Sequence, residues 1–169
     1  VTNINRGQRD IKIFEIFKRY LHEGEKETLG ILMTGKRHED WRASRKEVVE
    51  FFDLKGVVES LACHLGVSIS IEANPSRIFD ETSSGRIMFD GKEIGSLGKV
   101  RREILSNWEI KNQDIYFAGL HLDAILVLPK KINRYQAMIE FPAVVRDVSL
   151  AVNKEITYQA IEKICCQHG

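Results

Sequence analysis

The sequence has little cysteine and almost no net charge, and these two absences exclude several classes of protein. Its 169 residues include three cysteines, two of them adjacent at Cys165 and Cys166, which is too few for a disulfide framework and indicates a reducing compartment. The formal net charge is +1, so no bulk charge draws the chain to nucleic acid or to a membrane surface. No apolar run approaches the roughly 18–20 residues of a membrane span. The remaining composition, 43% hydrophobic and 29% charged, predicts a globular protein with a buried core.

The first residues lack an initiator methionine and the layout of a signal peptide. We therefore expect the chain to be a piece of a longer protein. Its length fits one domain of ordinary size, or one domain with a fragment of another.

The first half of the chain predicts two strands followed by a helix. Apolar and β-branched residues concentrate at 11–20 and 28–34, with a polar, hairpin-like stretch between them. Ser44 and Glu47 have the spacing of a capping box, and Gly66 is a plausible C-terminal cap for the helix. Gly56 lies inside this helix, where either a closely packed neighbour or a break would explain it. The apolar stripe of the predicted helix consists of Phe51, Leu54, Val58, Leu61, Ala62 and Leu65.

The second half predicts further strands in hairpin arrangement. Residues 67–72 alternate between apolar and polar, Asp90-Gly91 is a two-residue hairpin signal, and residues 115–122 are typical of another strand. Asp123 can cap the short apolar segment 124–128. Because strands and helices do not alternate regularly, the fold class expected is α+β, a mainly antiparallel sheet with flanking helices.

The end of the chain predicts the beginning of a second domain. Residues 129–134 are basic and polar and have the composition of a connector. Residues 144–152 alternate like a strand, and Thr157 can cap a helix that carries Tyr158, Ile161 and Ile164. One strand and one helix cannot enclose a core, so this domain is expected to be incomplete. Within the predicted strand, Arg146 and Asp147 are candidates for a structural ion pair.

No motif assigns a catalytic, cofactor-binding or metal-binding residue. The segment 95–99, Gly-Ser-Leu-Gly-Lys, lacks the spacing of a phosphate loop, and its glycines are better explained by a bulge or a close backbone approach. The five histidines and three cysteines show no metal-ligand spacing, including the run Cys165-Cys166-Gln167-His168. No Ser or Cys stands in a nucleophile elbow.

Local clusters of positive charge are the remaining candidates for binding. Each could contact phosphates, although solvated surface is the more economical explanation at this net charge. Those retained as possible contacts to nucleic-acid phosphates are Lys130, Lys131, Arg134, Arg101 and Arg102; a further cluster consists of Lys36, Arg37, Arg42, Arg45 and Lys46.

Several segments, taken in order, resemble the C-terminal part of the beta subunit of bacterial phenylalanine–tRNA ligase. The most specific are Phe-Asp-Leu-Lys-Gly at 52–56 and Phe-Pro-Ala-Val-Val-Arg-Asp at 141–147. They are accompanied by Asn-Ile-Asn-Arg at 3–6, Ile-Phe-Glu-Ile at 13–16, Leu-Gly-Ile-Leu-Met-Thr-Gly at 29–35, Trp41, and the Asp-Gly-Lys-Glu-Ile-Gly hairpin at 90–95. The resemblance spans almost the whole chain.

This resemblance implies a division into three parts. Residues 1–128 would be a catalytic-like but non-catalytic module with the class II aminoacyl-tRNA synthetase fold, 129–140 a linker, and 141–169 the truncated start of a ferredoxin-like anticodon-binding domain.

The resemblance also implies a function in a larger enzyme. The parent would be a cytoplasmic α2β2 assembly that uses ATP and Mg²⁺ to attach phenylalanine to tRNA. The alpha subunit would supply catalysis, so this chain alone would be an inactive scaffold without a cofactor. The alternative is a free-standing α+β RNA-binding module with no enzyme partner.

Overall fold

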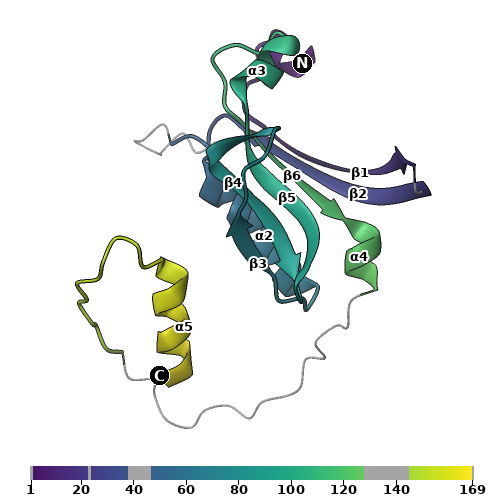
Figure 1. Cartoon of the computed structure of the whole chain (residues 1–169). Coiled ribbons are helices and arrows are strands. Elements are labelled where there is room, and N and C mark those ends of the chain that lie inside the picture. The colour runs from purple at the N-terminus through teal and green to yellow at the C-terminus, as the bar shows by residue number, and fades with distance from the viewer. Residues whose placement is uncertain (1, 23, 38–46, 128–144, 169) are drawn as a thin grey trace. The chain divides into compact units, whose positions relative to one another are not determined.

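The computed structural model describes residues 2–22, 24–37, 47–127 and 145–168. The chain divides into two compact units, 1–133 and 134–169 (Figure 1). The boundary between the units falls inside the predicted linker 129–140. The whole of this linker lies outside the described residues. The two units are therefore described separately.

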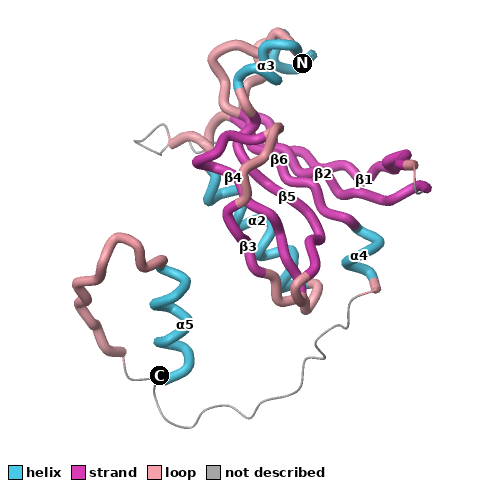
Figure 2. Tube along the Cα trace, viewed as in Figure 1, coloured by secondary structure: helices cyan, strands magenta, loops and turns pink. Residues whose placement is uncertain are grey.

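The first unit is built on one six-stranded sheet with the order β1-β2-β6-β5-β4-β3. Every pair of neighbouring strands is antiparallel, and Figure 2 shows these strands in magenta. This confirms the prediction of an α+β fold with an antiparallel sheet. The strands are β1 (Ile11–Leu21), β2 (Gly24–Thr34), β3 (Ser70–Ala73), β4 (Phe79–Phe89), β5 (Lys92–Val100) and β6 (Ile115–His121).

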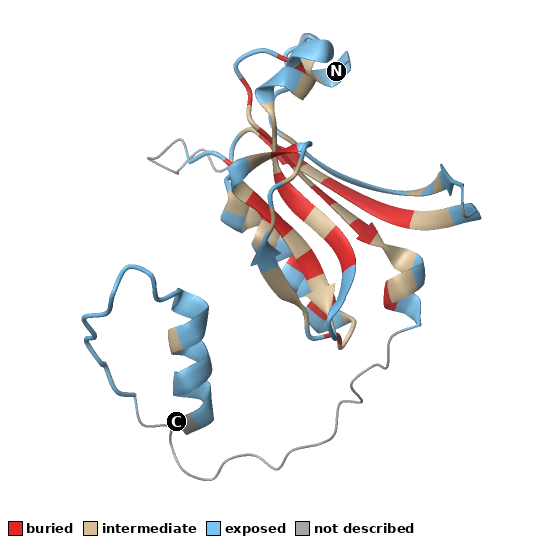
Figure 3. Ribbon diagram, in the orientation of Figure 1, coloured by how far each residue is buried: buried red, intermediate tan, exposed pale blue. Residues whose placement is uncertain are grey.

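One face of the sheet is covered by α2 (Phe51–His64), and this contact forms the main core. Leu54 and Val58 of α2 are fully buried, as are Ile87, Leu97 and Ala118 of the central strands. The red segments of Figure 3 show that burial concentrates in these central strands. Three short helices complete the unit: α1 (Thr2–Asn5), α3 (Arg102–Asn107) and α4 (Leu122–Leu126).

The start of α2 differs from the prediction. Ser44 lies outside the described residues, but the helix begins at Phe51 and its capping box is formed by Glu50 and Asp53. The Glu50 amide donates to the Asp53 carboxylate at 2.7 Å. An acidic side chain in the first turn satisfies a free backbone amide and favours the helix dipole, so the later acidic pair marks the start of the helix.

Neither explanation offered for Gly56 is correct. The helix runs through this residue without a break, and a Cβ placed on it would meet no atom within 4 Å. The predicted cap at Gly66 is confirmed, because it has a positive φ of 70° immediately after the helix.

Three further predicted features can be compared with the structure: one strand, one turn and one helix cap. The strand predicted at 67–72 forms only from Ser70. The Val67 amide instead donates a hydrogen bond to the Ala62 carbonyl, at the end of α2, at 2.9 Å. The turn at Asp90 and Gly91 has the expected positive φ angles of 46° and 74°. Asp123 does not cap α4: the helix starts at Leu122, two residues earlier than predicted, with His121 at the N-cap position. The Asp123 carboxylate instead accepts a hydrogen bond from the Glu27 amide at 3.0 Å.

The second unit contains the predicted helix but not the predicted strand. α5 (Tyr158–His168) begins after Thr157, whose hydroxyl accepts a hydrogen bond from the Ala160 amide at 3.3 Å. Residues 145–152, the described part of the predicted strand, have no regular secondary structure. Alternation alone does not make a strand, since a strand needs a hydrogen-bonded neighbour. The ferredoxin-like character expected of this segment is thus not seen.

Gly56 gives a first testable prediction. Gly56→Ala should raise the free energy of unfolding by about 1 kcal/mol, because alanine has the higher helix propensity and the added methyl group meets only solvent. Chemical denaturation of the two proteins would measure this difference.

Gly95→Ala is the matched control. A Cβ at Gly95 of β5 would collide with the carbonyl of Gly119 on β6, so the same substitution should here lower stability by about 1–3 kcal/mol. Equal effects of the two substitutions would contradict both assignments.

Candidate partner-binding surface

The edge strand β1 exposes large apolar side chains along most of its length. β1 is the outermost strand of the sheet, and among the described strands it pairs with β2 alone. Such residues are normally buried, and a contiguous exposed set marks an interaction site. The exposed residues, with their exposed fractions, are Ile13 57%, Phe14 76%, Ile16 59%, Tyr20 77% and Leu21 44%.

The register of the sheet explains this exposure. Phe14 lies opposite Ile31 and Ile16 lies opposite Leu29, so both share the face on which α2 packs. Ile31 and Leu29 are buried there, whereas the side chains on β1 remain exposed, because the layer formed by α2 does not extend to the edge of the sheet. Figure 3 shows the same contrast between β2 and β1.

The opposite face of the sheet, which we call the open face, has no helix over its centre. Phe17 and Phe117 lie on this face, and a Cβ added to Gly30 between them would approach their rings to 3.1 and 3.3 Å. Gly30 thus provides the space into which the two aromatic rings pack. The open face therefore presents an apolar floor.

An apolar groove of about 440 Å³ lies at one end of the open face. α1 and α3 form one wall of the groove, and β1, β2 and β6 form its floor. Trp108, directly after α3, is 61% exposed at this groove. The principal apolar residues that line it are Ile4, Ile13, Leu32, Leu105, Trp108 and Phe117.

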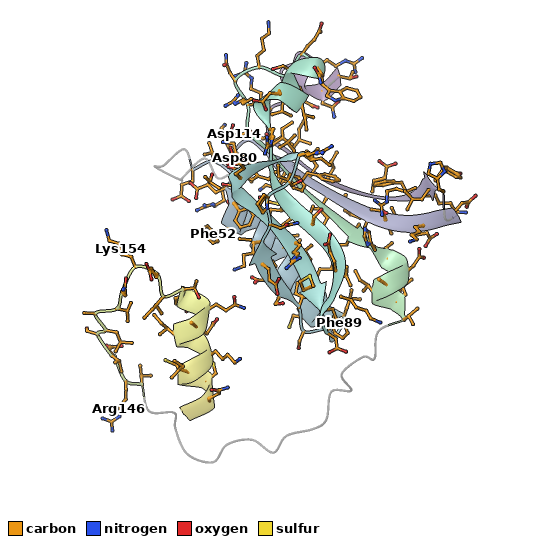
Figure 4. The ribbon with its side chains drawn as sticks, viewed as in Figure 1. Phe52, Asp80, Phe89, Asp114, Arg146 and Lys154 are labelled. Atoms are coloured by element: carbon orange, nitrogen blue, oxygen red, sulfur yellow. The ribbon has the colours of Figure 1, made fainter. Side chains whose placement is uncertain are left out.

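The two arginines predicted as tRNA contacts within this unit already have protein partners. Arg101 donates to the carbonyl of Phe79 at 2.7 Å and contacts Glu81 at 3.2 Å. Arg102 contacts Asp114 at 2.9 Å, and Lys99 contacts the same carboxylate at 2.9 Å. Asp114 is labelled in Figure 4. This cluster is therefore largely neutralised.

Arg37 is the centre of a second charged cluster. Its guanidinium lies 2.9 Å from Asp53, 3.1 Å from Glu47 and 3.7 Å from Glu50. The hydrogen bond with Asp53, followed by the charges of the three carboxylates, raises the pKa of Arg37 above its usual value. This arrangement holds the start of α2 against the end of β2, so we assign it a structural role.

The other predicted candidates either lie outside the described residues or are exposed. Lys130, Lys131 and Arg134 lie outside the described residues, as do Arg42, Arg45 and Lys46 of the other cluster. Arg146 and Asp147 are both exposed, so the burial expected of their ion pair is not seen, and their pairing stays a prediction.

The remaining chemical candidates are dispersed in the described part of the chain. Gly95 and Gly98 lie within β5, where a Cβ would meet β6 and Phe79 respectively; close backbone approach, not phosphate binding, explains them. No group of three or more His, Cys, Asp or Glu side chains could hold a metal ion in the ranges described. Cys63, Cys165 and Cys166 are exposed free thiols.

The fold perturbs the ionisation of His121, which lies at the end of β6. Burial is the main cause, and the nearby charge of Arg19 adds to it; both lower the pKa of His121 below its usual value of 6.5. His121 lines a pocket together with Asp123 and Glu93. Because the neutral ring is favoured in the folded state, His121 links stability to pH.

The antiparallel sheet with its helices is similar to a class II synthetase-like fold. The structure is similar to the crystal structure of pyrrolysyl-tRNA synthetase from Desulfitobacterium hafniense, with a TM-score of 0.56, 17% sequence identity, and coverage of 74% of this chain and 43% of that one. At this identity the likeness concerns the fold alone.

Sequence comparison identifies the family. Residues 1–122 match the family described as the phenylalanyl tRNA synthetase beta chain CLM domain, and the chain therefore belongs to this family. Phenylalanine–tRNA ligase beta subunits are similar over most of the chain: that of Syntrophus aciditrophicus is 33% identical over 91% of it, and that of Thermotoga maritima is 32% identical over 90%.

The chain spans about a fifth of the length of these curated relatives, 20% in both cases. The family model ends at residue 122, so the second unit lies beyond it. Within the described residues, none of the helices combines the length and the apolar character needed to cross a membrane.

The perturbed histidine predicts a pH dependence of stability. As the pH falls below about 6.5, the unfolded chain takes up a proton at His121 more readily than the folded protein, so the free energy of unfolding should decrease. Denaturation between about pH 7.5 and 5.5 should show a smaller decrease for His121→Gln than for the parent protein. Identical pH profiles would contradict this linkage.

Proposed function

We propose that this chain is a non-catalytic scaffold part of a phenylalanine–tRNA ligase beta subunit, and that it binds the catalytic alpha subunit through the open face. The observation that carries the proposal is the apolar groove of about 440 Å³ at the end of this face. Membership of the beta chain family supports the choice of partner.

The groove has the properties of a protein interface. Interface centres are enriched in aromatic residues and depleted in charge, and this groove combines Trp108 and Phe117 with aliphatic side chains. Trp108 is 61% exposed, so a partner that covers it would remove a large apolar area from water. The rigid sheet beneath the groove would keep this surface in one shape.

The described residues do not fit a site for ATP and Mg²⁺. Nucleotide phosphates need convergent cations, but on the open face Arg19 donates to Thr28 at 3.0 Å and Arg86 contacts Glu72 at 2.8 Å. Arg101 and Arg102 are likewise paired. We therefore assign ATP and Mg²⁺ to the parent enzyme, and no catalytic residue to this chain.

The finer organisation also belongs to this proposal. Residues 1–128 would act as the catalytic-like module in a cytoplasmic α2β2 assembly that attaches phenylalanine to tRNA. Residues 129–140 would be a linker, and 141–169 the start of the anticodon-binding domain. The helix α5 after Thr157 is compatible with such a start.

The alternative, a free-standing RNA-binding module, has less support. It would need basic side chains available for phosphates, whereas Arg101 and Arg102 contact Glu81 and Asp114. Similarity to beta subunits also favours an enzyme partner.

Association with the alpha subunit tests the proposal directly. The purified chain should co-migrate with a phenylalanine–tRNA ligase alpha subunit on a sizing column, and Trp108→Ser should weaken the complex about tenfold or more, because it removes an aromatic anchor. Phe52→Ser is the matched control, since Phe52 is also exposed (71%) but lies on α2, outside the groove. The proposal fails if no complex forms with the parent chain.

The chain alone should not bind ATP or form phenylalanyl-adenylate. Isothermal titration calorimetry with ATP and Mg²⁺ should give no binding heat, because Arg19 and Arg86 lie on β1 and β4, with three strands between them, and do not converge on one phosphate site. Micromolar ATP binding by the isolated chain would overturn its assignment as a non-catalytic scaffold.

A further inference from the structure

The exposed edge of β1 has a pattern of side chains that is complementary to itself. We propose that two copies of this chain associate by antiparallel pairing of their β1 strands, with Phe17 opposite Phe17, Glu15 opposite Arg19, and Phe14 opposite Tyr20. This pairing would join the two sheets edge to edge. It uses the free edge of β1, a strand of which only Ile11 and Ile13 also line the groove assigned to the alpha subunit.

Part of β1 lies where the described sheet is only two strands wide. β6 pairs with β2 only from Thr28 to Thr34, so β1 residues 18–21 and β2 residues 24–27 form a two-stranded extension in the described sheet (Figure 1). Two-stranded ribbons are marginally stable in water, and a long apolar edge strand readily pairs with another strand. A second copy would supply the missing neighbour.

The charged residues of β1 are complementary between two copies in this register. Glu15 is exposed and lies opposite Gly30 on β2, so the residue directly across from it has no side chain to pair with. In the proposed register Glu15 instead faces Arg19 of the second copy, and the two-fold symmetry forms this pair twice. Opposite charges directly across an antiparallel pair are stabilising.

The aromatic residues of β1 also face one another in this register. Phe14 and Tyr20 are 76% and 77% exposed, and the same register places each opposite the other on the face that carries α2. Phe17 lies on the open face at the two-fold axis. Aromatic pairs across neighbouring strands stabilise a sheet.

Other registers lose these matches. Sliding the second copy by two residues in one direction places Lys18 opposite Lys18, and in the other direction it places the Glu15 carboxylate opposite Phe17. A slide by one residue would place each α2-side residue opposite an open-face residue. The register centred on Phe17 therefore satisfies charge and apolar contacts together.

Analytical ultracentrifugation of the whole chain tests the proposal by charge exchange. The parent chain should dimerise, Glu15→Arg should raise the dissociation constant at least about tenfold by placing like charges opposite each other, and Glu15→Arg combined with Arg19→Glu should restore dimerisation. Glu103→Arg, which makes the same charge change on α3, should have no effect. A monomer at all concentrations, or a dimer indifferent to Glu15→Arg, would overturn the proposal.

Disulfide formation tests the register itself. In a chain with Cys63, Cys165 and Cys166 replaced by serine, Glu15→Cys combined with Arg19→Cys should form a covalent dimer on oxidation. Glu15→Cys alone should remain monomeric in denaturing electrophoresis, because the two cysteines would be separated by about 13 Å along the strands. Efficient crosslinking of the single variant, or none of the double variant, would exclude this register.

Discussion

The packing of α2 on one side of a single antiparallel sheet is the constraint on which the rest of this structure depends. Leu54 and Val58 are fully buried against central strands that come from distant parts of the sequence. Because α2 packs over the middle of one face, β1 retains exposed apolar residues, and on the other face α1 and α3 lie only at one end of the described sheet. Fold stability and exposed binding surface are thus two results of the same packing.

Much of the fold could be predicted because local chemistry and tertiary packing agree. At Asp90-Gly91 both residues adopt the positive φ angles that the dipeptide favours, and Thr157 caps α5 through its side chain. Prediction failed where several local patterns compete. Glu50 and Asp53, rather than Ser44 and Glu47, form the capping box of α2, and only the final packing position of the helix selects between them.

The candidate site was much less predictable than the fold. Composition shows that the segment around Phe14 is apolar, but burial depends on which strand becomes the edge, and that follows from the pairing of β2 with β6. The groove at Trp108 likewise requires α1 and α3 to meet the end of the sheet. The surroundings of the positive charges also required the structure: Arg102 and Lys99 share Asp114, a partner that local sequence does not reveal.

The contacts around Arg37 have a consequence for how this family can vary. The Arg37 amide donates to the Glu47 carbonyl at 2.8 Å, and the Val49 amide donates to the Gly35 carbonyl at 2.8 Å. Between these two hydrogen bonds, Lys36 and Val48 form an isolated antiparallel β-bridge. Backbone contacts therefore hold residues 35–37 beside residues 47–49, whatever the side chains of the residues between them. Doubling the length of such a closed segment costs only about 0.6 kcal/mol, so evolution can lengthen or shorten it without displacing the helix that organises the core.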